Sequence, residues 1–412
     1  AANVAGYPAE LHGGLCDVSD RNYGATPGQV RNPCDVYMDV PTACATKADC
    51  PLIFFFHGTA DNATKFIGQS YFTTTHAYSE VASTAIHADG NVIGIYIQGV
   101  SHGLNLGWNM GNTGGTTDDM AFVQKIVTVL QGRGYTGRRY AVGISNGAHF
   151  AQKIATNSGM GFSGAVATIA ALPALPASAG PAPFTYNYPS TNTNTRKTAV
   201  MLLQGSADML LNAHGTPIPH DANAQFGAGY AKVPTTQSSG IDSAYLWADV
   251  NGCRSPTQAN GIAVTYKYAE EGSSLSTTAT QLQFDCDPQF ATRYVEVQCM
   301  GHQVPFTVAG QSWAAYALSF LKAVDTACAS SGDCGSSAPI YSLAAATAWP
   351  SYTGSGFGVT IAGLSAKPFC KDTFSTNVDN EPAPTQASMC STSCAFQGDS
   401  VFTANLNVHQ PP

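Results

Sequence analysis

The sequence is short of charge, and of basic charge above all. Of its 412 residues only 11% are charged, with 18 Lys and Arg against 26 Asp and Glu, which gives a formal net charge of −8. An ordinary soluble domain carries about 25% charged residues. Because nucleic-acid binding depends on clustered Lys and Arg that neutralise phosphates, this composition argues against a nucleic-acid partner.

Long apolar runs are also missing. A membrane-spanning helix needs about 20 consecutive apolar residues, and the longest candidate, residues 165–177, is interrupted by Pro173 and Pro176. We therefore expect no membrane partner. Aromatic residues make up 10% of the chain and its net charge is low, so disorder is excluded as well. The composition predicts a soluble globular protein, which we expect to be a monomer.

The cysteines indicate disulfide bonds rather than zinc. The chain has twelve of them, with no C-x2-C pair, and its C-x3-C pair, Cys390 and Cys394, has no paired histidines nearby. An even, dispersed set fits disulfides in an oxidising compartment. The opening residues AANVAG resemble a mature N-terminus left by signal cleavage, so we expect a secreted protein. Two pairs are spaced for short-loop disulfides: Cys44 with Cys50, and Cys328 with Cys334.

Composition divides the chain into three parts. Residues 1–50 are rich in Gly, Pro and Asn, hold four cysteines and lead through a strand-like stretch at 35–40 into the main domain. Residues 51–327 alternate apolar runs with helical patterns. Residues 328–412 are rich in Ser, Thr, Ala and Gly and contain cysteines. We interpret this last part as an extension, either a small disulfide-stapled module or a segment that wraps the main domain.

The main part reads as alternating strands and helices. Short continuous apolar runs, several of them ended by Gly, are typical of strands buried on both faces of a parallel sheet. Helical periodicity indicates helices between them, and Asp118 and Asp119 mark the first turn of the one at 118–131. The pattern predicts βαβ units, and hence a doubly wound, mostly parallel α/β sheet. The predicted strands are 52–58, 92–99, 138–145, 164–172, 198–205 and 292–299, and the predicted helices are 118–131, 146–155 and 313–324.

The sharpest motif is GISNG at 143–147. It lies where an apolar strand becomes an amphipathic helix without a loop, which is the setting that the G-x-S-x-G motif requires. Such a turn exposes the Oγ of Ser145 above the sheet and aims the helix N-terminus at a developing oxyanion. The motif therefore predicts a serine nucleophile, against the alternative of a glycine-rich turn with an incidental serine.

A serine nucleophile needs a base and an acid that orients the base. With this turn they follow in the order Ser, Asp or Glu, His, each after a later strand. Asp208 follows the strand at 198–205, and His302 follows the strand at 292–299. The rivals lie in polar loops, in the tail, or after no convincing strand: Asp221, Asp242, His214, His220 and His409.

The oxyanion hole needs two backbone N–H donors. One belongs to the residue after the nucleophile, Asn146, and the other to the loop after the first core strand. In that loop we predict the N–H of Thr59 as the second donor. His57 precedes Ser145 in the chain, so we interpret it not as the base but as a residue that shapes this loop and contributes to substrate binding.

With these residues in place, the chain resembles secreted α/β-hydrolase esterases. More narrowly, it resembles the group that joins feruloyl esterases of the carbohydrate esterase family 1 type with polyhydroxybutyrate-depolymerase-like esterases. The resemblance covers roughly residues 50–325 and implies the α/β-hydrolase fold, with the C-terminal extension added to it. The segments that carry it are FFFHGTADN (54–62), GWN (107–109), TDDMAF (117–122), GISNG (143–147), QGSAD (204–208), WADVNGC (247–253) and GH (301–302).

The resemblance also implies roles for other residues. Trp108 is expected near the acyl-binding side of the pocket as a substrate-binding residue, with core packing as the alternative. Asp118 and Asp119 are expected to brace the helix behind the turn at Ser145. Independently of the resemblance, Cys299 lies three residues before His302, so we expect it to form a disulfide that holds the histidine loop, with Cys253 or Cys286 as partner.

The sequence thus predicts a serine esterase that needs no metal and no organic cofactor. Its partner is an ester substrate: a feruloyl or other aryl ester on plant polysaccharide, or a polyester such as polyhydroxybutyrate. The weakly charged surface suits a neutral polymer. Two alternatives remain, a non-catalytic extracellular binding protein on a hydrolase scaffold and a secreted serine peptidase of the same fold. Asn62 begins a glycosylation sequon that we expect to be unused because it follows the oxyanion loop.

Overall fold

A computed structural model describes the main domain of the chain. The residues described are 36–59, 61, 63, 66, 82–102, 105–108, 119–172, 197–206, 208, 240–267, 274–302, 304–305, 307–332 and 334. The predictions for residues 1–35, for the extension beyond Cys334, and for the sequon at Asn62 lie outside this set.

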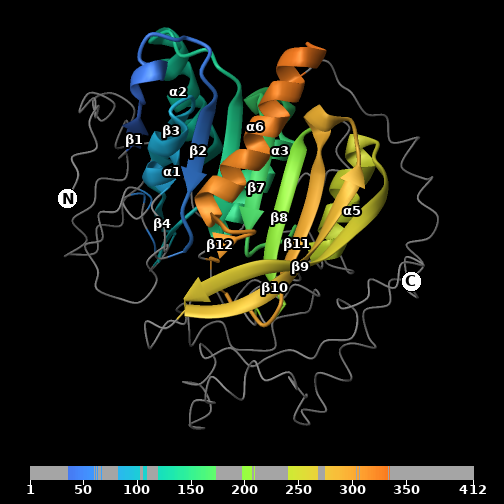
Figure 1. The fold of residues 1–412 in the computed structure, drawn as a ribbon. Coiled ribbons are helices and arrows are strands. Elements are labelled where there is room, and N and C mark those ends of the chain that lie inside the picture. The colour runs from blue at the N-terminus through green and yellow to red at the C-terminus, as the bar shows by residue number, and fades with distance from the viewer. Residues whose placement is uncertain are drawn as a thin grey trace, which may run out of the picture.

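The centre of the domain is a parallel sheet (Figure 1). Six parallel strands lie side by side in the order β3-β2-β6-β7-β8-β11. Most of their residues are buried apolar side chains, as the continuous apolar runs predict. The prediction of a mostly parallel α/β sheet is therefore confirmed. The six strands are β2 (Leu52–Phe56), β3 (Ile93–Ile97), β6 (Arg139–Ile144), β7 (Phe162–Thr168), β8 (Ala199–Gly205) and β11 (Thr292–Val297).

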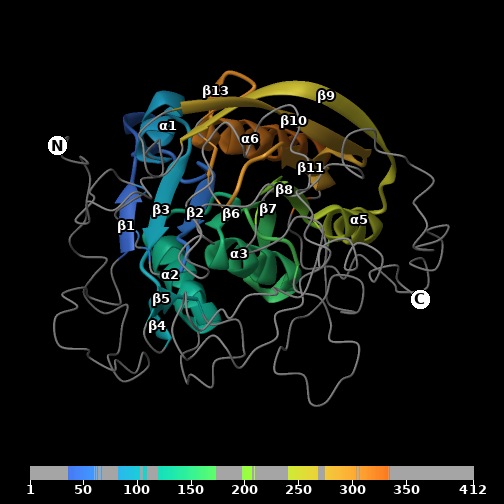
Figure 2. The ribbon, with the colours of Figure 1, turned by 90° about the horizontal axis from the view of Figure 1, so that it is seen from below.

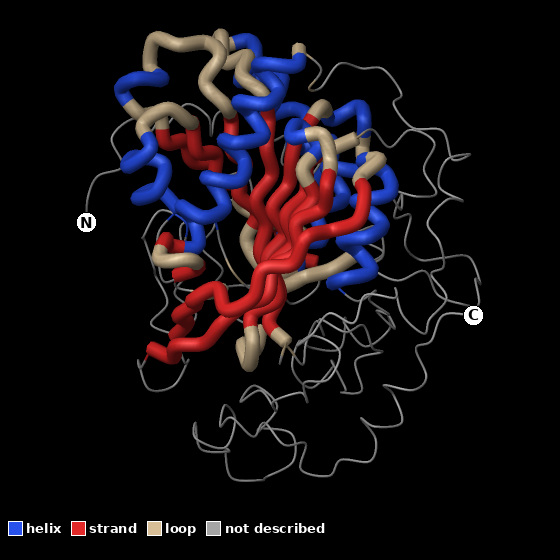
Figure 3. Tube along the Cα trace, turned by 45° about the vertical axis from the view of Figure 1, so that its right-hand side comes forward, coloured by secondary structure: helices blue, strands red, loops and turns tan. Residues whose placement is uncertain are grey.

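Antiparallel strands extend the sheet at both edges. Strand β1 (Val36–Asp39) pairs with β3. On the other side, β10 (Ser274–Asp285) pairs with β11, β9 (Arg254–Lys267) with β10, β12 (Thr307–Val308) with β9, and β13 (Gln311–Ser312) with β12. Figure 3 shows the β9–β10 hairpin continuing past the ends of the central strands. A separate small hairpin is formed by β4 (Val100–His102) and β5 (Asn105–Gly107).

Helices cover both faces of the sheet, which gives three layers (Figure 2). Helices α1 (Ala82–Asp89) and α6 (Trp313–Ser331) lie on one face. Helices α2 (Asp119–Gly132), α3 (Asn146–Thr156) and α5 (Gly240–Asn251) lie on the other. Short 3-10 turns complete the described elements: η2 (Thr42–Cys44), η4 (Ser158–Met160) and η5 (Pro288–Phe290).

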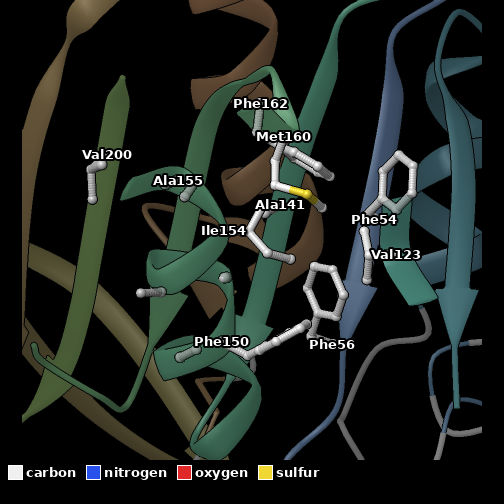
Figure 4. Packing of buried hydrophobic residues seen from close by; sticks show 14 of the residues in the cluster. Phe54, Phe56, Val123, Ala141, Phe150, Ile154, Ala155, Met160, Phe162 and Val200 are labelled. Carbon is white, nitrogen blue, oxygen red and sulfur yellow. The ribbon is translucent and has the colours of Figure 1, made fainter. Parts of the chain in front are cut away.

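Two apolar clusters fill the space between the layers. Alternate residues of one strand serve both, because successive side chains of a strand point to opposite faces. Phe54 and Phe56 of β2 pack under α2 and α3 with Phe150 and Phe162 (Figure 4), while Phe55 of the same strand packs under α1 and α6. Because α3 packs on the same face as Phe54 and Phe56, its first turn lies directly against the end of β2. The candidate site lies at this contact.

Three disulfides join described cysteines. Cys44–Cys50 and Cys328–Cys334 are bonded, as the short spacings predict. The third bond joins Cys253 to Cys286 and closes the base of the β9–β10 hairpin. The expectation that Cys299 pairs with one of these two residues is therefore wrong, because each is the other's partner.

Within the described part of the chain, no helix combines the length and the apolar character that crossing a membrane requires.

Candidate active site

Ser145 stands at the turn between β6 and α3. Its φ is +53°, a left-handed value that non-glycine residues rarely adopt. Its N–H donates to the carbonyl of Thr168 on β7, and its carbonyl accepts the N–H of Ala148. The backbone strain is therefore held by bonds to both neighbouring elements, as is common at functional sites. The structure has the sharp strand-to-helix turn that the GISNG motif predicts.

The two glycines of the motif are needed for close backbone approach. A Cβ on Gly143 would lie 2.1 Å from the carbonyl oxygen of Gly147. A Cβ on Gly147 would lie 2.1 Å from the carbonyl oxygen of Phe56 and 2.5 Å from that of His57. The first turn of α3 therefore rests directly on the backbone at the end of β2, which brings Ser145 to the loop that follows that strand.

Ser145, His302 and Asp208 form one hydrogen-bonded chain. His302 Nε2 lies 2.9 Å from Ser145 Oγ, and His302 Nδ1 lies 2.8 Å from Asp208 Oδ2. A carboxylate only accepts hydrogen bonds, so the network assigns the proton to Nδ1 and leaves Nε2 to accept from the serine hydroxyl. Asp208 is fully buried, whereas the side chain of His302 is 14% exposed. Ser145 and His302 are therefore the solvent-accessible members of this hydrogen-bonded group, and Asp208 is the enclosed one.

The loops that carry Asp208 and His302 are in backbone contact. A Cβ on Gly205, the last residue of β8, would lie 2.0 Å from the carbonyl oxygen of Met300. The hydroxyl of Ser206 accepts the N–H of Cys299 at 2.9 Å. The hydroxyl of Tyr266 on β9 donates to the carbonyl of Cys299, also at 2.9 Å. The β9–β10 hairpin and the β8 loop therefore hold the His302 loop from two directions.

His57 holds the loop after β2. Its Nε2 accepts the N–H of Gly99 at 2.9 Å, so the proton belongs on Nδ1, which donates to the carbonyl of Gly58 at 2.7 Å. In a trans peptide the C=O and the following N–H point in opposite directions. The bond to Gly58 O therefore fixes the direction of the N–H of Thr59. Gln98 also lies against His57 Nε2, at 3.1 Å.

The two segments expected to supply oxyanion donors meet around Gly107. A Cβ there would lie 2.9 Å from Asn146 Oδ1 and 4.0 Å from Thr59 Oγ1. Asn146 is the first residue of α3, so its N–H has no partner within the helix. Both predicted donors therefore belong to residues that border one small region beside Ser145.

Trp108 lies beneath this region rather than at its surface. It is 2% exposed, and its ring stacks on Phe150 at 5.0 Å and meets Phe56 edge-on at 5.1 Å. His57 is fully buried. Both residues were predicted for substrate binding, and the structure places both side chains in the interior, beside the apolar cluster under α3. For Trp108 this is the packing alternative.

The structure describes only some of the other residues that the sequence singled out. Asp119 is buried in the first turn of α2. Asp118 and the rivals Asp221, His214, His220 and His409 lie outside the described residues, as does the side chain of Asp242. Three polar residues that hold the site were not predicted, Gln98, Ser206 and Tyr266. For Ser206 the signal was its place between the strand end and Asp208, whereas the other two have no local signal.

Ser145, Asp208 and His302 follow β6, β8 and β11 of the parallel sheet, in that chain order. Together with the turn at Ser145, this is the arrangement of the α/β-hydrolase fold. No family model and no curated protein matches the sequence.

Solved structures of hydrolases show distant similarity. The Bacillus cereus carboxylesterase has 13% identity over 50% of this chain and 82% of its own, with a TM-score of 0.28. Est1E of Butyrivibrio proteoclasticus with ferulic acid bound has 14% identity over 48% and 82%, with a TM-score of 0.28. FphF, a fluorophosphonate-binding serine hydrolase of Staphylococcus aureus, has 11% identity over 42% and 74%, with a TM-score of 0.31.

Proposed function

We propose that this protein is a serine carboxylic-ester hydrolase with Ser145 as nucleophile, His302 as base and Asp208 as the orienting acid. The observation that carries the proposal is the continuous chain from Ser145 Oγ through His302 to Asp208, at 2.9 Å and 2.8 Å. Three side chains from separate strand ends meet with the donor and acceptor order that proton transfer requires.

The reaction follows from these positions. Ser145 Oγ attacks the ester carbonyl carbon while His302 Nε2 takes the hydroxyl proton. Asp208 keeps His302 in the Nδ1–H form and stabilises the imidazolium. The carbonyl oxygen becomes an oxyanion that accepts from the N–H groups of Asn146 and Thr59. The C–O bond to the leaving group breaks, and His302 returns the proton to the departing alcohol.

Water then completes the cycle. His302 deprotonates a water molecule that attacks the acyl-enzyme, the bond to Ser145 breaks, and the serine recovers its proton as the carboxylic acid leaves. All groups in this scheme are protein side chains, backbone N–H donors, substrate and water. We therefore propose no metal and no cofactor for the reaction.

In place of the substrate contact first expected, we assign a positioning role to His57 and an interior place to Trp108. The burial of both side chains supports this revision. For His57 the support is specific, because its Nδ1–H bond to Gly58 orients the Thr59 N–H that would bind the oxyanion.

For the substrate we propose a feruloyl or other aryl ester on plant polysaccharide, or a polyester such as polyhydroxybutyrate. The resemblance of the motifs and the low content of charged residues, 11%, support a neutral polymer. The three disulfides support a secreted protein, since such bonds persist in oxidising compartments.

One panel tests both levels of the proposal. Wild type and Ser145→Ala are assayed on a short-chain p-nitrophenyl ester, on methyl ferulate and on a polyhydroxybutyrate film. We expect the wild type to turn over the p-nitrophenyl ester and one of the other two, and Ser145→Ala to lose about 10⁴-fold or more of that rate. Labelling of Ser145 by a fluorophosphonate probe is expected in the wild type.

Other outcomes of the same panel contradict the proposal. No turnover of any ester by the wild type, together with no labelling of Ser145, would point to a non-catalytic binding protein. Equal turnover by wild type and Ser145→Ala would exclude Ser145 as the nucleophile. Cleavage of a protein substrate such as casein, with no ester turned over, would point to a peptidase. A variant with more surface charge tests the proposal of a neutral polymeric substrate. Replacing surface Thr and Ser by Lys and Glu should weaken adsorption to the film. Unchanged adsorption would contradict the proposed role of the weakly charged surface.

A further inference from the structure

Trp108 bonds to both segments that border the candidate oxyanion hole. Its backbone N–H donates to Asn146 Oδ1 at 2.7 Å, and its carbonyl accepts from Asn146 Nδ2 at 3.4 Å. Its indole Nε1–H donates to the carbonyl of His57 at 2.9 Å. One residue therefore joins the start of α3 to the end of β2 through three hydrogen bonds.

The ring of Trp108 strengthens the same link. It stacks on Phe150, one turn along α3 from Asn146, with 5.0 Å between ring centroids and 13° between planes. It also meets Phe56, the residue before His57, edge-on. Polar and aromatic contacts thus fix Trp108 to each segment separately. A buried side chain with this many partners has a single well-defined orientation.

The chemistry requires such a link. An oxyanion hole works because two N–H donors point at one place before the reaction begins, and misplacement of a donor by about 1 Å can cost about 10²-fold in rate. Thr59 and Asn146 lie on different elements, and only non-covalent contacts set their relative position. Trp108 holds the residue before Gly58 on one side and the side chain of Asn146 on the other.

We propose that Trp108 is the positioning residue that keeps the N–H groups of Thr59 and Asn146 aligned on the oxyanion. This inference rests on the proposed esterase function and goes beyond it. Trp108 itself need not touch the substrate. Its loss is expected to weaken binding of the transition state while leaving binding of the ground-state ester in place, since only the transition state carries the oxyanion.

Trp108→Phe tests the indole bond, because phenylalanine keeps an aromatic ring but cannot donate to His57. We expect kcat for the p-nitrophenyl ester to fall about tenfold or more, with KM changed less than twofold. A trifluoromethyl ketone forms a tetrahedral adduct on serine that carries the oxyanion, so its inhibition constant should rise by the factor by which kcat/KM falls. The pH at which kcat/KM rises to its plateau should stay unchanged, since the His302–Asp208 pair is intact.

Trp247→Phe is the matched control. Trp247 is also fully buried, and its Nε1–H donates at 3.3 Å to Oε1 of Gln152, which lies about two turns along α3 from Ser145. This variant loses a buried indole hydrogen bond without touching the site, so its melting temperature should fall while kcat and the ketone affinity stay near wild type. Asn146→Ala, which removes the other half of the link from a partly exposed position, keeps the test open if Trp108→Phe does not fold.

The outcomes separate the two claims. The positioning role alone is overturned if the wild type hydrolyses ester and Trp108→Phe keeps a kcat within twofold of wild type. If Trp108→Phe does not fold, the same result in Asn146→Ala overturns it. An equal loss of kcat in Trp247→Phe also overturns it, because the effect would then be general destabilisation. A wild type that hydrolyses no ester and is not labelled at Ser145 overturns the proposed function and this inference with it.

Discussion

The hydroxyl of Ser206 accepts the backbone N–H of Cys299 at 2.9 Å. Ser206 stands two residues before Asp208 and Cys299 three residues before His302, so this bond joins the loop of the candidate acid to the loop of the candidate base. Cys299 has a φ of +55°, a conformation that costs a non-glycine residue free energy. The bonds to Ser206 and Tyr266 hold that conformation on both sides of the residue.

Ser206→Ala should therefore impair catalysis more than stability. The N–H of Cys299 loses its acceptor, and the His302 loop is freed to shift relative to Asp208. We expect kcat for a p-nitrophenyl ester to fall about tenfold, with a loss of about 1 kcal/mol in the free energy of unfolding. Ser319→Ala removes a similar hydroxyl bond on α6, to the carbonyl of Tyr316, and should leave kcat unchanged. Equal rates for wild type and Ser206→Ala would show that the bond has no catalytic consequence.

Gly205→Ala should damage the site by steric contact. A Cβ would lie 2.0 Å from the carbonyl oxygen of Met300 and 2.7 Å from that of Gly301, and these are backbone atoms that cannot rotate away. The His302 loop must move, so we expect at least about 10²-fold loss of kcat/KM. Gly132→Ala, where the added Cβ meets nothing within 4 Å, is the control and should keep wild-type rates. Retained activity in Gly205→Ala would mean that the loop tolerates displacement.

Asp208→Asn should block the reaction while keeping the shape of the site. An amide can donate its N–H to His302 Nδ1, which then turns the imidazole into the tautomer with the proton on Nε2. That tautomer cannot accept the proton of Ser145. We expect kcat to fall about 10⁴-fold, with little change in KM and a near-native circular dichroism spectrum. A loss of less than tenfold would exclude Asp208 as the orienting acid.

From the buried hydroxyl of Tyr140 we expect the free energy of unfolding to decrease in alkali. Its side chain is buried on β6 and its hydroxyl donates to Asp325 Oδ1 at 2.9 Å. Burial, and then the neighbouring carboxylate, raise the pKa of Tyr140 well above its ordinary value. The folded protein keeps this proton where the unfolded chain loses it, so the stabilisation is complete below about pH 10 and declines as the pH rises further.

Tyr140→Phe isolates this contribution, since all other tyrosines are shared with the wild type. Between pH 9 and pH 11, urea unfolding should show the wild type losing about 1 kcal/mol more than the variant. At neutral pH the variant should instead be less stable by about 1 kcal/mol, because Asp325 loses a donor. Parallel decreases in the two proteins would mean that another group controls alkaline stability.

The central strands were predictable because nearly all of their side chains are apolar and buried. LIFFF of β2 and IGIYI of β3 are buried at every position, and a run without polar residues can only be placed between two helical layers. Helix α3 was predictable from its amphipathic pattern and from the GISNG motif at its start. Its last turn is one residue longer than expected, and α6 runs on to Ser331, where Gly332 ends it in a left-handed conformation.

The β9–β10 hairpin was not predicted, although it forms the longest strands described. Many of its residues are exposed Ser, Thr, Ala and Asn, so no continuous apolar run marks it. The available signal was weak alternation, Val264 with Tyr266 and Leu282 with Phe284, whose side chains are buried at every second position. Its disulfide likewise depended on which cysteines the hairpin brings together, and for that reason the pairing expected for Cys299 was wrong.

By itself the sequence determined which segments form the buried parallel strands, where the strained turn at Ser145 falls, and that Asp208 and His302 follow later strands. These are local properties: apolar runs, helical spacing, and small residues where the backbone must turn. Only the tertiary structure decided how separate segments meet. The link of Trp108 to Asn146 and His57 and the link of Ser206 to Cys299 join residues far apart in the chain, so no local pattern of side chains records them.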